Sequence, residues 1–319
     1  MSREFEVVSN PHFRNLHVFL VNMMSRTPHI HRELEIGWIL KGGTILRTGG
    51  ERYLLRAGDS YRVNPLDVHE FQSDAQDAVI LAVQVSPRIM DSFLSDTPSL
   101  RYGGSACLKR AVADAQDYRR LFDICVRLAR SYLEQQSGCE YLCFSLTAQL
   151  LARLDRLLPA ERLSKEAWAP FYRRMERMIS VTDYIDANFH RKLLLDEIAE
   201  REGLSMPHLS HIFRDTLGMS FQDYLKKRRF EYARPLILGT GRSLLDISLE
   251  SGFSDTRYMI RLFEEEFGCT PTAYRRQNRS AQGRQAAAGD SAQSFPDRAE
   301  AMRLLDAVVC GPDGIAKLP

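Results

Sequence analysis

Residues 196–218, DEIAEREGLSMPHLSHIFRDTLG, and residues 246–268, DISLESGFSDTRYMIRLFEEEFG, are two copies of one pattern and decide the fold of this part of the chain. In each copy a short helical segment ends at a glycine, Gly203 or Gly252, and a second amphipathic segment follows. The two glycines lie 49 residues apart. A glycine after a helix can adopt the left-handed conformation that ends it, which a side chain disfavours. The repeat therefore predicts two helix-turn-helix units.

The residues at each turn have separate physical roles. Leu204 and Phe253 are expected to fill the angle between the two helices of their unit. Ser205 and Ser254 are predicted to cap the second helix, because a serine hydroxyl can accept a hydrogen bond from an unpaired backbone N–H. Apolar residues at helical spacing form the predicted buried stripe of each second helix: Leu209, Ile212, Phe213 and Leu217 in the first copy, and Met259, Leu262, Phe263 and Phe267 in the second.

The side chains outside this stripe form the predicted DNA-reading face. Helix-turn-helix proteins place the N-terminal half of the second helix in the major groove, where each base pair presents a distinct pattern of donors and acceptors. Arginine suits guanine edges or phosphates, Ser, Thr and neutral His can donate or accept, and isoleucine can contact a thymine methyl. For each position the alternative is a solvated surface residue. The predicted set is His208, Ser210, His211 and Arg214 in the first copy, and Thr256, Arg257, Ile260 and Arg261 in the second.

The segment Tyr224–Ile237, between the two copies, is predicted to be one helix because its apolar residues recur at helical spacing. A helix of this length would set both units on one face of DNA. It also carries a run of basic residues, which is usually a solvated face but can contact phosphate beside a recognition helix. The apolar positions are Leu225, Phe230, Ala233 and Ile237, and the basic run is Lys226, Lys227, Arg228 and Arg229.

From Val181 to Arg276 the chain closely resembles the AraC family of transcription regulators. The resemblance rests on GLSMPHLSHIFRDTLGMSFQDYLKKRRFEYA, on DISLESGFSDTRYMIRLFEEEFGCTPTAYRR, and on the closing signature at residues 271–275. It implies double-stranded DNA as the partner and an N-terminal sensor for a small effector. Pro235 departs from the family pattern, which usually has a helix-favouring residue there. A proline inside a helix is expected to kink it.

The N-terminal region has a different periodicity. Between Leu16 and Val85, short apolar or alternating runs are broken by turn residues, a pattern typical of antiparallel strands in a closed barrel or sandwich. From about Ala115 the period becomes helical, and Gln135–Gly138 separates two runs that form a predicted helical hairpin ending at Pro159. This hairpin has one apolar stripe more than it needs, which either a partner subunit or the barrel covers.

Two stretches of this region, residues 28–35 and 58–69, resemble the two motifs of cupin barrels. If the first is a strand, its period of two places His29, His31 and Glu35 on one face. With His69 they would match the ligand set of a metal-dependent cupin enzyme, since imidazole and carboxylate suit a divalent transition metal. The alternatives are a metal-free effector pocket and histidines that complete the barrel core.

The resemblance to AraC-type sensors favours the metal-free effector pocket, because such sensors often keep a similar histidine and glutamate pattern without metal. It implies no cofactor and no catalytic residue, and it favours a sugar as the effector. The side chains expected to offer hydrogen bonds and stacking are His31, Glu35, Trp38 and Arg47.

Composition limits the class of protein only broadly. The 319 residues carry a net charge of +2, which is weak evidence for a nucleic-acid binder. No apolar run reaches the roughly 18 residues that suggest a membrane span, so we expect a cytoplasmic protein. Six cysteines are scattered along the chain, and reduced thiols are therefore expected.

The sequence thus predicts an α+β protein with four parts: a cupin-like effector-binding barrel, a helical hairpin for dimerisation, an all-α DNA-binding domain, and a flexible tail with a short helix near Arg298–Val309. We expect an activator, not an enzyme, that forms a homodimer and has RNA polymerase as a candidate further partner. The predicted boundaries are residues 1–105, 106–165, 171–277 and 278–319.

Overall fold

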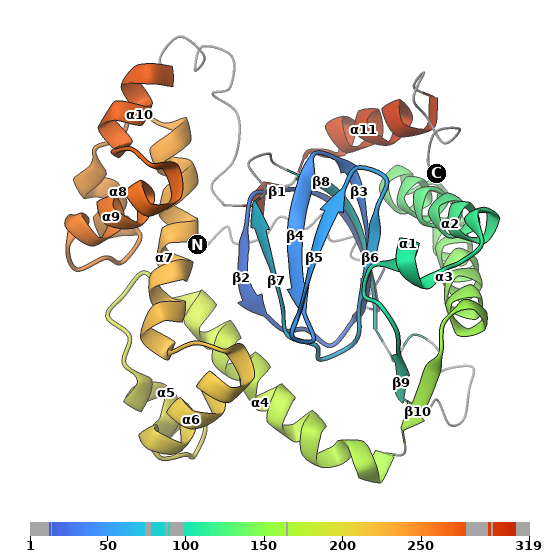
Figure 1. Ribbon diagram of the computed structural model, residues 1–319, viewed down its shortest axis with the longest axis horizontal. Coiled ribbons are helices and arrows are strands. Elements are labelled where there is room, and N and C mark those ends of the chain that lie inside the picture. The colour runs from blue at the N-terminus through green and yellow to red at the C-terminus, as the bar shows by residue number, and fades with distance from the viewer. Residues whose placement is uncertain are drawn as a thin grey trace. The chain divides into compact units, whose positions relative to one another are not determined.

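The computed structural model describes residue 13 and residues 15–73, 78–86, 89, 99–163, 165–278, 293–294 and 296–310 (Figure 1). The chain is of the α+β class and divides into two compact units. The first comprises Met1–Met24, His31–Tyr172 and Phe295–Pro319, and the second comprises Ser25–Ile30 and Arg173–Ser294.

The strands form antiparallel sheets. One sheet has the order β11-β1-β8-β3-β6, a second has the order β2-β7-β4-β5, and β10 pairs with β9. Leu16 lies opposite Val85 in the first sheet. The strands are β1 (Leu16–Met23), β2 (Arg26–His29), β3 (Leu34–Lys41), β4 (Gly43–Thr48), β5 (Glu51–Arg56), β6 (Ser60–Val63), β7 (His69–Ser73), β8 (Ala78–Val85), β9 (Ser99–Tyr102), β10 (Ala160–Leu163) and β11 (Gln293–Ser294).

Both faces of the first sheet are buried. Alternate residues of each strand point to opposite sides, so each strand contributes to two separate cores. In β3, Ile39 belongs to the core that also contains Leu46 of β4 and Phe71 of β7. Ile36 and Trp38 belong instead to a second core on the other face, shared with the helices. The predicted barrel or sandwich is therefore present, and its outer face is covered by helices.

The predicted helical hairpin forms α2 (Ala115–Glu134) and α3 (Cys139–Leu157), after the short α1 (Leu108–Ala111). Gln135 and Gly138, with φ of 52° and 82°, make the turn between them. Trp38 packs against Tyr118 and Phe122 of α2, with ring centroids 4.9 Å apart in both pairs. One side of the hairpin therefore docks onto the sheet, which accounts for part of its apolar surface.

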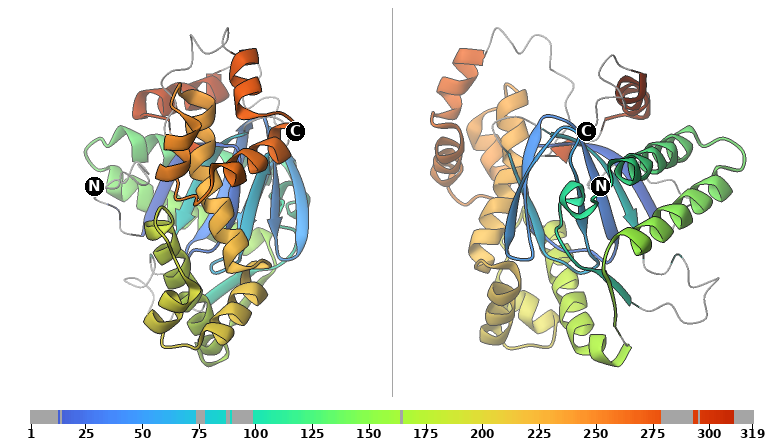
Figure 2. Two further views of the ribbon diagram at one scale, coloured as in Figure 1. Left: turned by 90° about the vertical axis from the view of Figure 1, so that its left-hand side faces the viewer. Right: turned by 45° about the vertical axis from the view of Figure 1, so that its right-hand side comes forward.

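The short helix predicted in the tail is present as α11 (Arg298–Cys310), and it packs on the first unit. Ala301 and Leu305 are buried in the same core as α2, and Asp306 forms an ion pair with Arg130. Figure 2 shows α11 beside the hairpin. This helix is thus part of the first unit's core, whereas residues 279–292 of the predicted flexible tail lie outside the described residues.

The second unit consists mainly of helices. Helix α7 joins the two helix-turn-helix units and continues without a break through Pro235, where a kink was expected. None of the helices in the described part of the chain combines the length and apolar content needed to cross a membrane. The helices are α4 (Lys165–Asn188), α5 (Leu195–Arg201), α6 (Met206–Leu217), α7 (Phe221–Gly239), α8 (Leu244–Glu250), α9 (Thr256–Phe267) and α10 (Pro271–Asn278).

The substitution Leu305→Ala tests the packing of α11. Leu305 is fully buried, and replacing a core leucine by alanine typically costs about 2–5 kcal/mol through lost burial and the cavity left behind. We expect the first unit to lose about this much free energy of unfolding in urea titrations of the full chain. Arg303→Ala, at an exposed position of the same helix, is the control. Equal stability of the two variants would contradict the packing of α11.

Candidate DNA-binding surface and effector site

Both predicted turns have the expected backbone. Gly203 and Gly252 have φ of 65° and 78°, in the left-handed region that favours glycine. Their surroundings differ. A Cβ atom at Gly203 would meet nothing within 4 Å, whereas one at Gly252 would lie 2.5 Å from the carbonyl oxygen of Phe189 and 2.8 Å from the backbone of His190. The second turn is therefore packed directly against the chain that follows α4.

The N-cap residue of the second helix agrees with the prediction in the first copy and differs from it in the second. Ser205 is the N-cap of α6, as expected, although its side chain makes no capping hydrogen bond. The N-cap of α9 is Asp255 and not Ser254, because the turn of the second copy is one residue longer. The second helices therefore repeat every 50 residues, whereas the first helices and the glycines repeat every 49.

This register changes which residues of the two copies are equivalent. Leu209 and Met259 are both fully buried, and Phe213 and Phe263 match in the same way. His208 then corresponds to Tyr258, which is 47% exposed and was not among the predicted reading-face residues. The signal that would have found Tyr258 is the 50-residue spacing of the buried stripe.

All eight residues of the predicted reading face lie at the surface of α6 or α9. Those that are exposed are His208, His211, Arg214, Arg257 and Arg261, and those that are half-buried are Ser210, Thr256 and Ile260.

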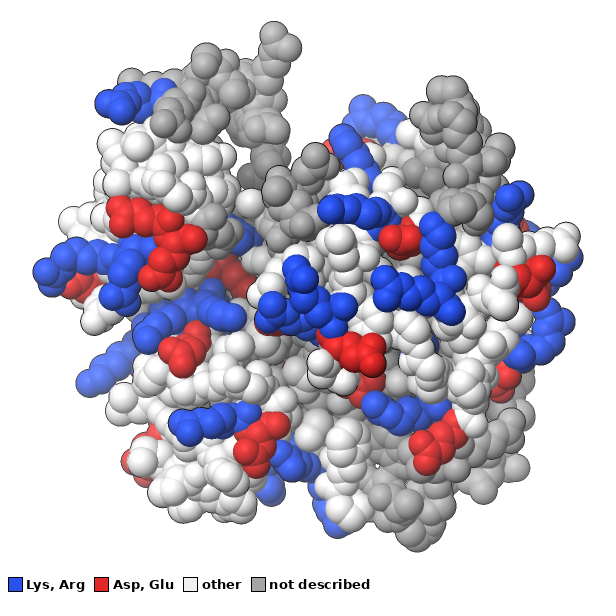
Figure 3. All heavy atoms as spheres, in the orientation of Figure 1, with Lys and Arg blue, Asp and Glu red and all other residues white. Residues whose placement is uncertain are grey.

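Several of these basic side chains have an acidic neighbour on their own helix. His211 Nε2 lies 3.3 Å from Asp215, and Arg261 Nε lies 3.7 Å from Glu265. Figure 3 shows acidic and basic side chains side by side over α8 and α9. A surface of this kind attracts phosphate less strongly than an unbroken basic face. Sequence-independent attraction to the DNA backbone is therefore expected to be weaker on this surface.

The basic run in α7 has two different roles. Arg228 is largely buried and pairs with Asp186 at 2.7 Å and with Glu231 at 2.5 Å. Arg229 donates to the carbonyl oxygens of Phe189 and Arg191, at 2.8 Å each. Both arginines therefore stabilise the end of α4, while Lys226 and Lys227 are exposed and remain candidates for phosphate contacts.

The same device recurs in the second copy. Arg275 of α10 donates to the carbonyl oxygens of Ile237 at 2.9 Å and Arg242 at 2.7 Å, at the end of α7. The carbonyl groups of a last helical turn have no partner within their helix, so an arginine from a neighbouring helix satisfies them. Arg229 and Arg275 lie 46 residues apart, so they play similar roles from positions that are not equivalent in the repeat.

In the first unit, Glu35 of β3 is the centre of a buried polar cluster. Its carboxylate accepts hydrogen bonds from Tyr61 Oη at 2.6 Å and from Gln84 Nε2 at 2.7 Å, and His31 Nε2 lies 3.0 Å away. Gly37 makes this arrangement sterically feasible, because any Cβ atom there would overlap the ring of Tyr61. Glu35 is only 4% exposed, so its charge depends on these partners.

Proton affinities in the cluster reflect this pairing. Burial alone would raise the pKa of Glu35, but the hydrogen bond and charge of His31, with the charge of His69 and the bond from Gln84, lower it to about 2. Burial alone would lower the pKa of His31, and its bond to Glu35 outweighs burial and raises it. The pair therefore favours a carboxylate next to an imidazolium.

Three histidines surround this cluster. One ligand atom of each of His29, His31 and His69 lies within 4.8 Å of the others, and Glu35 adjoins this group through His31 Nε2. The expected single strand is not formed, because His29 ends β2, His31 precedes β3 and His69 begins β7. The Nδ1 atoms of His29 and His69 each lie 3.0 Å from a backbone carbonyl oxygen, and that of His31 lies 3.1 Å from one. A carbonyl only accepts, so Nδ1 carries a proton, and in the neutral ring Nε2 has the lone pair that a metal needs.

The structure does not bring the other two predicted effector residues to Glu35. Trp38 points to the face of β3 opposite Glu35 and packs under α2. Arg47 is half-exposed on β4 and pairs with Glu70 at 3.1 Å. Tyr61 and Gln84, which do contact Glu35, come from β6 and β8, and their proximity depends on strand register that the sequence does not reveal.

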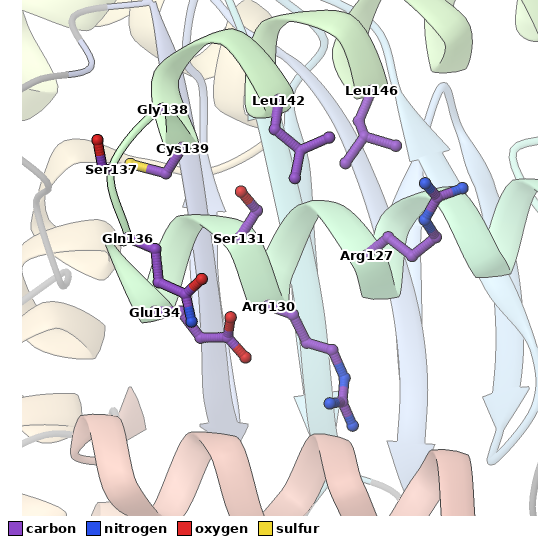
Figure 4. A pocket seen from close by; sticks show the side chains of 10 residues that line it. All are labelled: Arg127, Arg130, Ser131, Glu134, Gln136, Ser137, Gly138, Cys139, Leu142 and Leu146. Carbon is purple, nitrogen blue, oxygen red and sulfur yellow. The ribbon is translucent and has the colours of Figure 1, made fainter.

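A surface pocket of about 270 Å³ lies at the turn of the helical hairpin (Figure 4). Leu142 and Leu146 of α3 point toward α2, whereas Arg130 points toward α11. The pocket contains none of the predicted effector residues, so we keep the Glu35 cluster as the candidate effector site. The residues that line the pocket at the hairpin turn are Arg127, Arg130, Ser131, Glu134, Gln136, Ser137, Gly138, Cys139, Leu142 and Leu146.

Two protein families match the chain. The family described as AraC-like ligand binding domain matches residues 22–157, which include β3, the Glu35 cluster and the hairpin. The family described as Helix-turn-helix domain matches residues 198–277. This range includes α6 and α9, the second helix of each helix-turn-helix unit, which we call the recognition helices.

Individual proteins are similar over different parts of the chain. An uncharacterised HTH-type transcriptional regulator of Staphylococcus aureus (strain MSSA476) is 28% identical over 245 residues, or 76% of this chain and 31% of that protein. The chain thus spans about a third of the length of such curated relatives. The C-terminal domain of the response regulator yesN from Fusobacterium nucleatum is 32% identical, covering 30% of this chain and 93% of its own, with a TM-score of 0.28. ToxT from Vibrio cholerae O395 is 12% identical, covering 82% and 97%, with a TM-score of 0.43.

The two turn glycines give a matched pair of substitutions. Gly203→Ala introduces a side chain into a left-handed conformation with open space around it, which should cost about 1 kcal/mol of folding free energy. Gly252→Ala adds the same strain and also forces Cβ against the backbone of Phe189 and His190, so we expect a clearly larger loss. Urea denaturation of both variants measures the difference. Equal losses would show that the second turn is not in close contact with that backbone.

Proposed function

This chain belongs to the AraC family of transcription regulators, and we propose that it is a sequence-specific DNA-binding activator controlled by a small effector. In this proposal residues 1–105 hold the effector, residues 106–165 join two subunits, and residues 171–277 bind double-stranded DNA at a promoter. The observation that carries the proposal is the pair of helix-turn-helix units whose second helices both leave polar and basic side chains exposed.

The reading face in this proposal consists of the eight predicted residues together with Tyr258. Arg261 and Tyr258 lie on the same side of α9, with the guanidinium 5.2 Å from the ring centroid. An arginine placed next to an aromatic ring can contact a guanine edge or a phosphate. On α6, His208 and His211 take the equivalent positions, so the two units would read different bases.

The effector site in this proposal is the cluster of Glu35, His31, Tyr61 and Gln84. A buried carboxylate, an imidazole, a phenol and an amide offer both donors and acceptors, which suits the hydroxyl groups of a sugar. The effector would act by binding one arrangement of the DNA-binding units more tightly than another, because only a difference in affinity can shift the population.

Dimerisation would use the helical hairpin. After one side of the hairpin has docked onto the sheet, α3 still exposes Tyr141 (83%) and Leu142 (47%). Exposed apolar side chains of this size are candidates for a subunit interface. A dimer would double the number of recognition helices, and RNA polymerase remains a candidate partner of the DNA-bound form. A regulator of this kind would act in the cytoplasm.

Metal sensing is a second candidate function, favoured by the geometry of His29, His31 and His69. The backbone contact of each Nδ1 atom is the support that metal-binding histidines usually have. Three imidazole nitrogens within 4.8 Å of one another fit a divalent transition metal. Binding would displace the proton that His31 shares with Glu35, so affinity should fall as the pH is lowered.

Measurement of bound metal distinguishes metal sensing from effector binding in the barrel. If the protein senses metal, the purified chain incubated with Zn²⁺ or Ni²⁺ and then desalted should retain about one ion per chain at pH 7.5. His69→Gln should abolish retention, whereas His190→Gln, outside the cluster, should not. A chain that retains no ion but gains thermal stability with a sugar would exclude metal sensing and support the effector pocket.

Substitution of Arg261 tests the proposed DNA-binding function. A duplex selected from a randomised library by the wild-type protein is the probe, and fluorescence anisotropy measures affinity. We expect Arg261→Ala to lose about 1–3 kcal/mol of binding free energy on the selected duplex. Arg52→Ala removes the same charge from an exposed position on β5 and should have little effect.

The unselected library distinguishes the kind of contact. A loss confined to the selected duplex indicates that Arg261 reads a base, and an equal loss on both indicates a phosphate contact. Unchanged binding to both would remove Arg261 from the reading face. Failure of the wild-type protein to enrich any duplex would contradict the proposed function itself.

A further inference from the structure

Arg257, at the start of α9, is held by the residue that caps the same helix. Asp255 Oδ1 accepts a hydrogen bond from the backbone N–H of Arg257 at 2.8 Å, which caps α9. The same carboxylate accepts from the guanidinium, at 2.9 Å from Nε to Oδ2 and 2.5 Å from Nη2 to Oδ2. The bond to Arg257 lowers the pKa of Asp255. One carboxylate therefore fixes both the helix start and the arginine.

This pair differs from an ordinary surface ion pair. The Arg257 side chain is 89% exposed, and a free arginine there would lose much rotamer entropy when it contacted a base. Asp255 is itself fixed by its capping bond, and the two residues are only two positions apart, so little further ordering is needed. By contrast, Arg261 and its acidic neighbour Glu265 are 3.7 Å apart and exposed to a similar degree.

The contacts leave one edge of the guanidinium unoccupied by Asp255. The hydrogen bonds to Asp255 use Nε and one N–H of Nη2, so Nη1 and the second N–H of Nη2 face away from the carboxylate. These two groups form the end of the fork that can bind O6 and N7 of guanine. The carboxylate also repels phosphate, which disfavours a contact of Arg257 with the DNA backbone.

The first helix-turn-helix unit provides an internal comparison. In the register of the helices, Ser205 takes the place of Asp255 and Pro207 takes the place of Arg257. The helix-turn-helix fold therefore forms without this pair. Serine is also an adequate cap in this chain, since Ser220 and Ser243 each accept a backbone N–H at the start of α7 and α8. The Asp255–Arg257 pair is a property of the second helix-turn-helix unit and is not required for the helix-turn-helix fold.

We propose that Asp255 is a positioning residue that directs Arg257 toward a base edge and makes α9 selective at that base pair. This inference rests on the proposed DNA-binding function. It assigns Arg257 to base reading and explains why an acidic residue stands on a surface that approaches a polyanion. The base class that fits is guanine, because it offers two acceptors on its major-groove edge.

The variant Asp255→Ser tests the inference, because it keeps a capping hydroxyl and removes the carboxylate. The probe is again a duplex selected from a randomised library by the wild-type protein, and a set of single-base variants of it locates the base pair read by Arg257. We expect Asp255→Ser to reduce the preference at that base pair by at least about fivefold. Affinity for the unselected library should stay the same or rise, since a negative charge is lost.

A double-mutant cycle separates positioning from a structural role. Asp255→Ser should have no further effect on preference in the Arg257→Ala background, because the residue it positions is absent. Asp255→Asn, which keeps the cap and one acceptor oxygen, should retain part of the preference. Equal weakening on all duplexes with unchanged preference, or the same loss of preference with and without Arg257, would overturn the inference. Neither result would affect the proposed function, which fails only if the wild-type protein selects no duplex.

Discussion

The close approach of Gly252 to the backbone of Phe189 and His190 is the contact on which the arrangement of the two helix-turn-helix units depends. Gly252 has a left-handed backbone and no side chain, so the second turn can sit against the carbonyl oxygen of Phe189. That oxygen also accepts a hydrogen bond from Arg229 of α7. The end of α4, the shared helix α7 and the second turn therefore meet at one point, and this junction relates the two recognition helices to each other.

Around this junction the same architecture is used twice with different surface chemistry. Buried residues match between the copies, as with Phe213 and Phe263, and arginines from α7 and α10 satisfy the carbonyl groups at the ends of α4 and α7. The exposed residues do not match: α6 presents histidines and α9 presents arginine and tyrosine. Packing thus determines the repeat, whereas the solvent-facing positions are not constrained by it and differ between the copies. Acidic neighbours of the basic residues reduce attraction that is independent of sequence.

Local patterns in the sequence predict the turns, the buried stripes and the exposure of the proposed reading face, because these depend on neighbouring residues along one helix. They missed Asp255 as a cap because the second turn is one residue longer than the first, and they left out Tyr258, the counterpart of His208. In the barrel, the period of two separates Glu35 from Trp38, which lies on the opposite face of β3, so the two could not have shared one site. Tyr61 and Gln84 come from other strands, and α11 packs on a helix far away in sequence. Contacts of this kind depend on register and tertiary packing, which no local pattern encodes.

In the proposed complex, two recognition helices of one chain read one face of DNA. Hydroxyl-radical footprinting of the wild-type protein on a selected duplex measures this directly, because it maps protection at single-nucleotide resolution along both strands. We expect two protected windows per bound chain, about 10 base pairs apart and on the same face, corresponding to successive major grooves. Loss of Arg261 should weaken one window and leave the other. A single protected window, unchanged when α9 is altered, would contradict the claim.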